Sequence, residues 1–298
     1  MVFFLYIVKL KLLKQKKYLK KLPLHFYIGL VLILVNWYLN WSLTGLRTYL
    51  LFFPLWLGYI LFIDSLVILR KNSSLLKRNW KKFVLLFLIS APAWWLFELL
   101  NLRTANWIYV GKEFFTDSEY AAYASLSFST VMPAVFETAE LVSAFNWTKH
   151  FRRKIIFTIT STRSKIIFTS GLVCVALLLF FPEYFFYLNW LSILLIIEPI
   201  NIWMKNASLF DFLSEGNWKP LISLITGCLI CGFFWEMWNF YSYPKWIYHL
   251  QIANFLHIFE MPVLGYLGYI PFSLELFAIY NFINGLFGNK KDSYLKFE

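Results

Sequence analysis

Long apolar runs, separated by short polar and basic stretches, make up most of the chain. A helix needs about 20 mostly apolar residues to cross a bilayer, and eight stretches come close to that length. The eight predicted spans are residues 24–42, 48–69, 83–100, 121–145, 166–182, 185–203, 219–238 and 262–286. The gap between the fifth and sixth spans, around Pro182 and Glu183, is typical of a tight helical hairpin. The pattern therefore predicts an all-α polytopic transmembrane helical bundle.

Composition supports a membrane protein. Of the 298 residues, 60% are hydrophobic, 22% are aromatic and only 15% are charged, whereas a soluble domain carries about a quarter charged residues. A chain this apolar would expose large apolar patches in water, which excludes an ordinary soluble domain. Cys174, Cys228 and Cys231 all lie inside apolar runs, so a secreted disulfide framework is not indicated.

The placement of the basic residues predicts an orientation. The net charge is +12, and 24 of the 28 Lys and Arg residues fall on one side of the eight-span arrangement, the side that holds both termini. Basic residues concentrate in cytoplasmic loops, so we expect a bacterial cytoplasmic (inner) membrane protein with both termini in the cytoplasm. The asymmetry favours membrane lipids as partners and argues against nucleic acid.

Polar residues recur along the chain at one spacing. Four pairs are separated by 138 positions: Glu98 and Glu236, Asn101 and Asn239, Pro133 and Pro271, and Glu137 and Glu275. Each copy contains four predicted spans, and an even number keeps both copies in the same orientation. We therefore expect two parallel repeats related by a pseudo-two-fold axis along the membrane normal. The expected segments are a basic interfacial segment (1–22), a first repeat (23–147), a basic cytoplasmic linker (148–165), a second repeat (166–287) and a cytoplasmic tail (288–298).

Carboxylates within predicted spans are the candidates for chemistry, because ionisable groups are costly in a membrane and are usually functional. In spans three and seven, a glutamate and an asparagine three positions later share one helix face. In spans four and eight, a glutamate follows a proline by one turn, and a kink at the proline would help to shape a cavity. The six candidate catalytic residues are Glu98, Asn101, Glu236, Asn239, Glu137 and Glu275. Alternatively, these side chains hold helices together through hydrogen bonds.

Further polar and aromatic residues flank the predicted spans. Asp64 and Glu198 lie close to lysine-rich loops, so we expect ion pairs there. The candidate substrate-binding residues are Trp107, Tyr109, Trp246, Tyr248 and His249, and the alternative role for the Trp and Tyr residues is anchoring at the membrane interface. His257 and Glu260, three positions apart, are candidates for a metal pair, with an interfacial histidine as the alternative. The sequence identifies no cofactor.

Several stretches carry a resemblance to known families. The segments EPINIWMKNASLF, CGFFWEMWNF and FEMPVLGYLGYIPFSLEL are similar to a family of uncharacterised bacterial polytopic membrane proteins. A W-x-Y element followed by a proline and a glutamate also resembles lycopene-cyclase-type membrane domains, which are tandem multi-span repeats. In this chain the glutamate follows the proline by four residues. The second resemblance implies an isoprenoid substrate.

Three functions remain open. The first is an intramembrane enzyme that acts on a lipid or isoprenoid by carboxylate acid/base chemistry. The second is a proton-coupled transporter of a small solute, and the third is a structural or assembly protein in the membrane. Abundant aromatic side chains, which can stabilise a developing cation, favour the enzyme.

Overall fold

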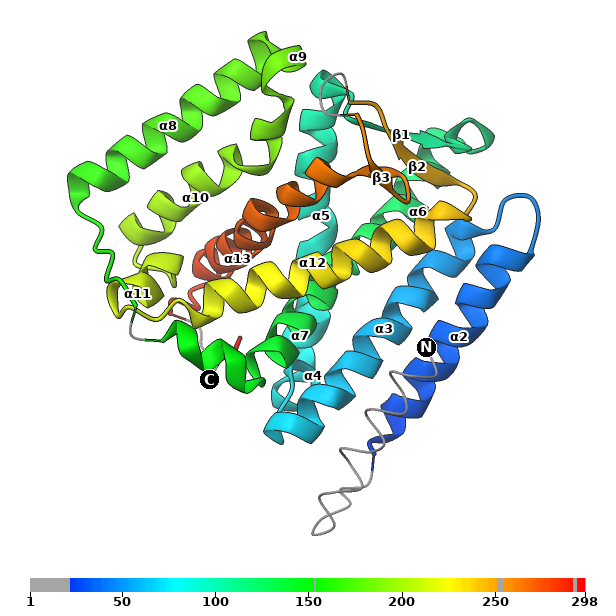
Figure 1. Cartoon of the computed structure of the whole chain (residues 1–298), viewed down its shortest axis with the longest axis horizontal. Coiled ribbons are helices and arrows are strands. Elements are labelled where there is room, and N and C mark those ends of the chain that lie inside the picture. The colour runs from blue at the N-terminus through cyan, green and yellow to red at the C-terminus, as the bar shows by residue number, and fades with distance from the viewer. Residues whose placement is uncertain (1–21, 153, 251–253, 292–293, 298) are drawn as a thin grey trace.

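Helices make up most of the protein (Figure 1). The computed structural model describes residues 22–152, 154–250, 254–291 and 294–297. The predicted interfacial segment 1–22 lies, apart from Leu22, outside the described residues. The predicted all-α helical bundle is confirmed, with short strands added at one end.

Six helices in the described residues are long and apolar enough to cross a membrane. They are α2 (Leu24–Ser42), α3 (Thr48–Lys71), α5 (Trp80–Thr104), α8 (Ser161–Phe180), α12 (Lys219–Phe240), and η4 (Val263–Gly268) continued by α13 (Tyr269–Leu286). A seventh candidate is bent by 43° and joins α9 (Pro182–Phe185), η3 (Phe186–Trp190) and α10 (Ser192–Trp203). The remaining helical segments are α4 (Leu75–Arg78), η1 (Lys112–Phe114), α6 (Asp117–Phe128), α7 (Val131–Ser143), η2 (Asn146–Phe151) and α11 (Leu209–Ser214). Helices of this length and composition define an integral membrane protein.

The fourth predicted span, 121–145, is divided between α6 and α7. Side-chain hydroxyls at the break bond carbonyls of the preceding turn: Ser129 donates to Leu126 O at 2.6 Å, and Thr130 donates to Ser127 O at 2.8 Å. Such bonds compete with the regular helical pattern. Because a helix rises about 1.5 Å per residue, neither half alone crosses a hydrocarbon core of about 30 Å. The prediction of eight spans is therefore not confirmed.

The prolines of the repeated pattern lie near the start of their α-helices. Pro133 lies in the first turn of α7, and Pro271 lies in the first turn of α13. A proline is tolerated in a first turn because its missing N–H would have no helical partner there. Pro133 therefore follows the break between α6 and α7, and Pro271 follows the junction between η4 and α13.

Side-chain caps explain why two spans begin earlier than hydropathy predicted. Asn79 accepts hydrogen bonds from the backbone N–H groups of Lys81 and Lys82, so α5 begins at Trp80 instead of residue 83. The Thr160 hydroxyl caps α8 in the same way, and this helix begins at Ser161 instead of residue 166. Capping satisfies N–H groups of the first turn, so a helix can extend into polar sequence beyond its apolar run.

The helices form two flanking pairs around a central group. Helix α2 packs along α3 and α8 packs along α10, with α5, α7, α12 and α13 between these pairs (Figure 1). Helices α3, α5 and α12 contact α7, whereas α10, α12 and α5 contact α13. The core is centred on α7, in which 12 of 13 residues are buried.

Glycines allow the closest helix contacts. A Cβ atom at Gly29 of α2 would lie 2.7 Å from Gly58 O of α3, and one at Gly227 of α12 would lie 2.7 Å from the backbone N of Ala139 in α7. Small residues let helix backbones approach closely in a membrane, where packing has to replace the hydrophobic effect as the driving force.

Two antiparallel ribbons close one end of the bundle. Strand β1 (Trp107–Val110) follows α5 and pairs with β2 (Lys245–Tyr248), which follows α12, so that Ile108 lies opposite Ile247. Strand β3 (His257–Ile258) pairs with β4 (Met261–Pro262). We call this the ribbon end. Strands β1 and β2 both lie outside the spans that hydropathy predicts, and the sequence does not reveal them, because four residues show little periodicity and each strand has its partner far away in the sequence.

The opposite end of the bundle is rich in lysine and arginine. We call it the basic end, and it contains Arg70, Lys71, Lys149, Arg152 and Lys219. Helix α3 ends there and α12 begins there. The two ends are therefore separated by the length of the membrane-crossing helices.

Candidate functional site

The two predicted asparagines connect helices to strands. The Asn101 side chain donates to Trp107 O at 2.8 Å and accepts from Trp107 N at 3.3 Å. The Asn239 side chain donates to Trp246 O at 2.7 Å and accepts from Trp246 N at 3.0 Å. Each amide therefore satisfies backbone groups at the start of a strand, which fixes the ribbon relative to α5 and α12. Neither asparagine is among the residues that line the cavity described below.

The glutamate that precedes each asparagine accepts hydrogen bonds from the strand that follows. Tyr109 OH donates to Glu98 Oε1 at 2.6 Å, and Tyr248 OH donates to Glu236 Oε1 at 2.7 Å. Burial raises the pKa of Tyr109 and of Tyr248 well above the usual value, and the neighbouring glutamate raises it further. Both phenols therefore stay protonated and donate to their glutamates.

The environments of the two glutamates otherwise differ. Glu98 Oε1 also accepts from the indole N–H groups of Trp94 at 2.8 Å and Trp107 at 3.0 Å. Glu236 is fully buried, and its Oε1 accepts from Tyr269 OH at 3.0 Å. Glu236 Oε2 is buried without a hydrogen-bond partner among the described residues. An unsatisfied buried oxygen is costly. Of the two glutamates at the ribbon end, Glu236 is therefore the one with an incomplete set of hydrogen-bond partners.

An aromatic cavity of about 590 Å³ lies beneath the ribbon. Ligand pockets usually measure about 300–1,000 Å³. Its walls include Trp94, Trp107, Trp190, Trp235, Trp246 and Tyr269, and Glu236 is its only lining carboxylate among the described residues. The Trp107 and Trp190 rings stack with centroids 5.6 Å apart, and the Trp235 and Tyr269 rings stack at 6.0 Å. The cavity is therefore a largely apolar space with one carboxylate, and Lys112 and Lys245 are its lysines among the described lining residues.

Four of the five predicted substrate-binding residues line this cavity: Trp107, Tyr109, Trp246 and Tyr248. The fifth, His249, is exposed and is not among the lining residues; its backbone N–H donates to Asn106 O at 2.8 Å. The aromatic residues are therefore packed against the protein interior.

Glu98, Glu137 and Glu275 are not among the residues that line the cavity, so Glu236 is the one predicted glutamate that does. Asp64 lies next to Glu137, and no N–H group among the described residues donates to the Glu137 oxygens. Glu275 Oε1 accepts from the backbone N–H of Leu194 at 3.2 Å.

The candidate metal pair is divided between different partners. His257 Nε2 is 2.9 Å from Asn254 Oδ1, whereas Glu260 forms an ion pair with Lys245. No group of three or more His, Cys, Asp or Glu residues suited to a metal ion occurs in the part of the chain that the structure describes.

The expected ion pairs differ between the two acids: Asp64 pairs with His25 instead of a lysine, and Glu198 forms no ion pair among the described residues. Asp64 Oδ2 is 2.9 Å from His25 Nε2, and Asp64 Oδ1 accepts from the backbone N–H of Leu76 at 3.1 Å. Glu198 accepts from the backbone N–H of Leu209 at 3.1 Å. Both acids therefore satisfy N–H groups of the short helices α4 and α11, a role that proximity to lysines in the sequence does not reveal.

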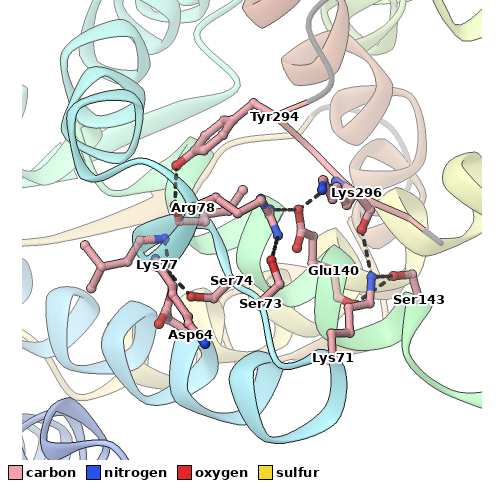
Figure 2. Close-up of polar contacts among 12 residues, drawn as sticks. Asp64, Lys71, Ser73, Ser74, Lys77, Arg78, Glu140, Ser143, Tyr294 and Lys296 are labelled. Carbon is pink, nitrogen blue, oxygen red and sulfur yellow. Dashed lines mark hydrogen bonds and ion pairs between the residues drawn. The ribbon is translucent and has the colours of Figure 1, made fainter.

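A network of charged groups lies at the basic end (Figure 2). Glu140 of α7 pairs with Arg78 and also accepts from the backbone N–H of Lys296 at 2.8 Å. Lys71 Nζ donates to Ser143 Oγ at 2.7 Å and to Lys296 O at 2.7 Å. The segment near the C-terminus is thereby fixed against α3 and α7.

Sequence reasoning missed several walls of the cavity. Trp94 lies one turn before Glu98, and this spacing of four was a usable signal. Trp190 and Trp235 carried no comparable signal, because apolar segments in this chain contain many aromatic residues and only the fold shows which of them meet.

Comparison with known proteins identified no relative. No protein-family model, no curated protein and no solved structure matches the chain. Functional arguments therefore depend on the site itself.

Proposed function

We propose that the protein is an intramembrane enzyme that acts on a lipid or isoprenoid within the aromatic cavity. The observation that carries the proposal is Glu236: a fully buried carboxylate that lines an apolar cavity and has one oxygen without a partner among the described residues. A substrate group that forms a hydrogen bond with this oxygen would complete its environment.

The surrounding groups suit acid/base chemistry. Glu236 would transfer a proton to or from the substrate, while Tyr248 and Tyr269 hold the carboxyl group through its other oxygen. The faces of Trp235 and Trp246 would stabilise positive charge that develops on an apolar substrate. Glu98, which has three donors on one oxygen, would support Trp107 and Tyr109 in the cavity wall.

We also propose that residues 23–147 and 166–287 are parallel copies of one unit. The helix contacts support this, since α3–α7 corresponds to α10–α13, α7–α12 to α13–α5, and α2–α3 to α8–α10. The ribbon supports it too: equivalent strands pair antiparallel with Ile108 opposite Ile247, as a two-fold axis between them requires. The cavity would then lie at the interface between the copies, where sites of repeat-built membrane proteins occur.

The proposed orientation places the basic end in the cytoplasm of a bacterium, with the protein in the inner membrane. Its support is the excess of Lys and Arg at that end, which follows the positive-inside rule. The aromatic cavity would then lie in the outer half of the bilayer. The resemblance to lycopene-cyclase-type domains favours an isoprenoid among apolar substrates.

A proton-coupled transporter is a second candidate function. His25 pairs with Asp64, and Asp64 lies next to Glu137; both acids are fully buried, and none of the three residues lines the cavity. Ionisable groups of this kind form proton paths in transporters.

Lipid analysis of cells distinguishes these functions. Glu236→Gln keeps the size of the side chain but removes its acid/base capacity. We expect cells with wild-type protein to differ in lipid composition from cells without it, and we expect Glu236→Gln to abolish this difference. Glu183→Gln, at an exposed position, is the matched control and should behave as wild type. Protein levels in the membrane are measured in parallel, with mass spectrometry of total lipids as the readout.

The outcomes separate the candidates. Identical lipids with and without the wild-type protein, combined with proton-linked uptake that Glu137→Gln abolishes, would favour the transporter. A protein that alters neither lipids nor uptake would fit a structural or assembly role.

A further inference from the structure

A second hollow, which we call the basic pocket, lies at the basic end, opposite the aromatic cavity. Its volume is about 760 Å³, and it is formed where the ends of α3 and α7 meet η2 and the start of α12. Its charged side chains are Arg70, Lys71, Lys149, Arg152, Lys219 and Glu215. Five cations and one carboxylate leave a net formal charge of +4 in a space large enough for a ligand.

Three of the five cations have no carboxylate partner among the described residues. No carboxylate in the described ranges lies within ion-pair distance of Arg70, Lys149 or Arg152, although Glu215 lines the same pocket. Like charges held close together repel one another, more strongly where water is partly excluded. An anion in the pocket would relieve this repulsion.

The walls of the pocket are built by specific contacts. Lys154 N donates to Gly216 O at 2.9 Å, and Trp218 N donates to Phe151 O at 3.0 Å, so the segment after η2 is joined to the turn before α12. Gly216 has a φ of +67°, and a Cβ there would lie 2.7 Å from Lys154 O, so the turn requires glycine. These contacts position Lys149 and Arg152 opposite Lys219, which is only 2% exposed.

Exposed apolar side chains flank the pocket-lining residues in the sequence. Phe145, Trp147, Ile155 and Ile156 are exposed on either side of the residues that supply Lys149 and Arg152. The Arg70 guanidinium lies 4.9 Å from the centroid of the Phe145 ring. Cationic groups next to exposed aromatic and aliphatic side chains, at the end of membrane-crossing helices, match the boundary between lipid headgroups and acyl chains.

We propose that the basic pocket binds a phosphate group, supplied by the headgroup of an anionic lipid. Arginine forms two parallel hydrogen bonds with phosphate oxygens, and lysine adds point charges, so Arg70 and Arg152 with Lys149 form a suitable set. Free phosphate or diphosphate shares this chemistry and is the second source to be tested. The proposal is independent of the aromatic cavity, which lies at the other end of the helices.

The test uses purified full-length protein in detergent and a charge-removal variant. Arg70→Gln, Lys149→Gln and Arg152→Gln are combined in one triple variant. The matched control removes the same number of charges from described basic residues outside the pocket, through Lys81→Gln, Lys165→Gln and Lys290→Gln. Native mass spectrometry counts bound dioleoyl-phosphatidylglycerol, with dioleoyl-phosphatidylcholine as the neutral-lipid reference, and calorimetry measures binding of inorganic diphosphate.

We expect the triple variant to bind phosphatidylglycerol at least about tenfold more weakly than wild type, since basic residues near a lipid surface attract anionic headgroups. The control should stay within about twofold. If wild type and the control bind diphosphate but the triple variant does not, and wild type shows no preference for phosphatidylglycerol over phosphatidylcholine, the pocket is a site for a free phosphate compound. That result would overturn the lipid as the source. Equal binding by wild type and triple variant, or equal loss in the control, would overturn the site itself. If the triple variant fails to fold, Lys149→Gln and Arg152→Gln are measured singly, with the same direction of change expected.

Discussion

At the residue scale, the two glutamates at the ribbon end are equivalent in sequence but not in environment. Glu98 accepts from two indole groups and one phenol, whereas Glu236 accepts from two phenols and keeps one oxygen without a partner among the described residues. The repeated spacing predicted both glutamates and their aromatic neighbours. It could not predict this difference, because Trp94 has glycine as its counterpart at position 232 and Tyr269 comes from another helix.

Replacing Tyr248 with phenylalanine tests the hydrogen bond to Glu236. The variant leaves the buried Glu236 Oε1 with Tyr269 as its remaining donor. We expect the free energy of unfolding to fall by about 1.5–3 kcal/mol, the usual contribution of a hydrogen bond to a charged group. Unfolding of purified protein in a denaturing detergent series gives the value. Tyr187→Phe, at an exposed tyrosine, should change it by less than about 0.5 kcal/mol, and equal losses in both variants would contradict the assignment.

At the element scale, hydropathy predicted the long helices better than their interruptions. The division of the fourth predicted span depends on hydroxyl groups at Ser129 and Thr130, which an average over about 20 residues conceals. Likewise, β1 and β2 form because Asn101 and Asn239 satisfy the backbone of the following residues and because the two strands meet in space. Caps such as Asn79 moved the starts of helices by a few residues, a change that local sequence signals do explain.

Replacing Asn239 with alanine tests the connection between α12 and β2. The variant leaves the N–H and C=O groups of Trp246 without their side-chain partner. Unsatisfied buried polar groups cost about 1–3 kcal/mol each, so we expect a loss of about 2 kcal/mol or more and faster amide hydrogen exchange across residues 245–248. Asn289→Ala, at an exposed position, serves as the control. Unchanged exchange in the strand would show that the asparagine does not hold it.

At the scale of the whole molecule, the sequence predicted a membrane bundle, and its shared spacing led to the proposal of two related halves. What the sequence could not predict is how the halves meet. The aromatic cavity is built from both halves, with Trp94 and Trp107 on one side and Trp235, Trp246 and Tyr269 on the other. Such contacts between distant segments depend on helix packing, and no single segment specifies them.

A cross-link tests the junction between the halves. Ile108 and Ile247 lie directly opposite in the antiparallel ribbon, where Cα atoms are about 4.5–5.5 Å apart, a separation that a disulfide can bridge. We expect Ile108→Cys combined with Ile247→Cys to form a disulfide under mild oxidation, detected as a linked peptide by mass spectrometry. Ile108→Cys with Lys245→Cys is shifted by two positions and should link poorly. Preferential linkage of the shifted pair would contradict the register and the two-fold relation inferred from it.

The central claim, that the aromatic cavity holds an apolar ligand, is tested most directly by filling the cavity. Ala124 lines it, and Ala121, three residues earlier in α6, is exposed. Native mass spectrometry of protein purified from its membrane would compare the small molecules bound to wild type, Ala124→Trp and Ala121→Trp. We predict one apolar species bound to wild type and to Ala121→Trp, and at least about tenfold less of it on Ala124→Trp, because the added indole occupies the space that the ligand needs. Equal occupancy in all three proteins, with Ala124→Trp correctly folded, would contradict the assignment of the cavity.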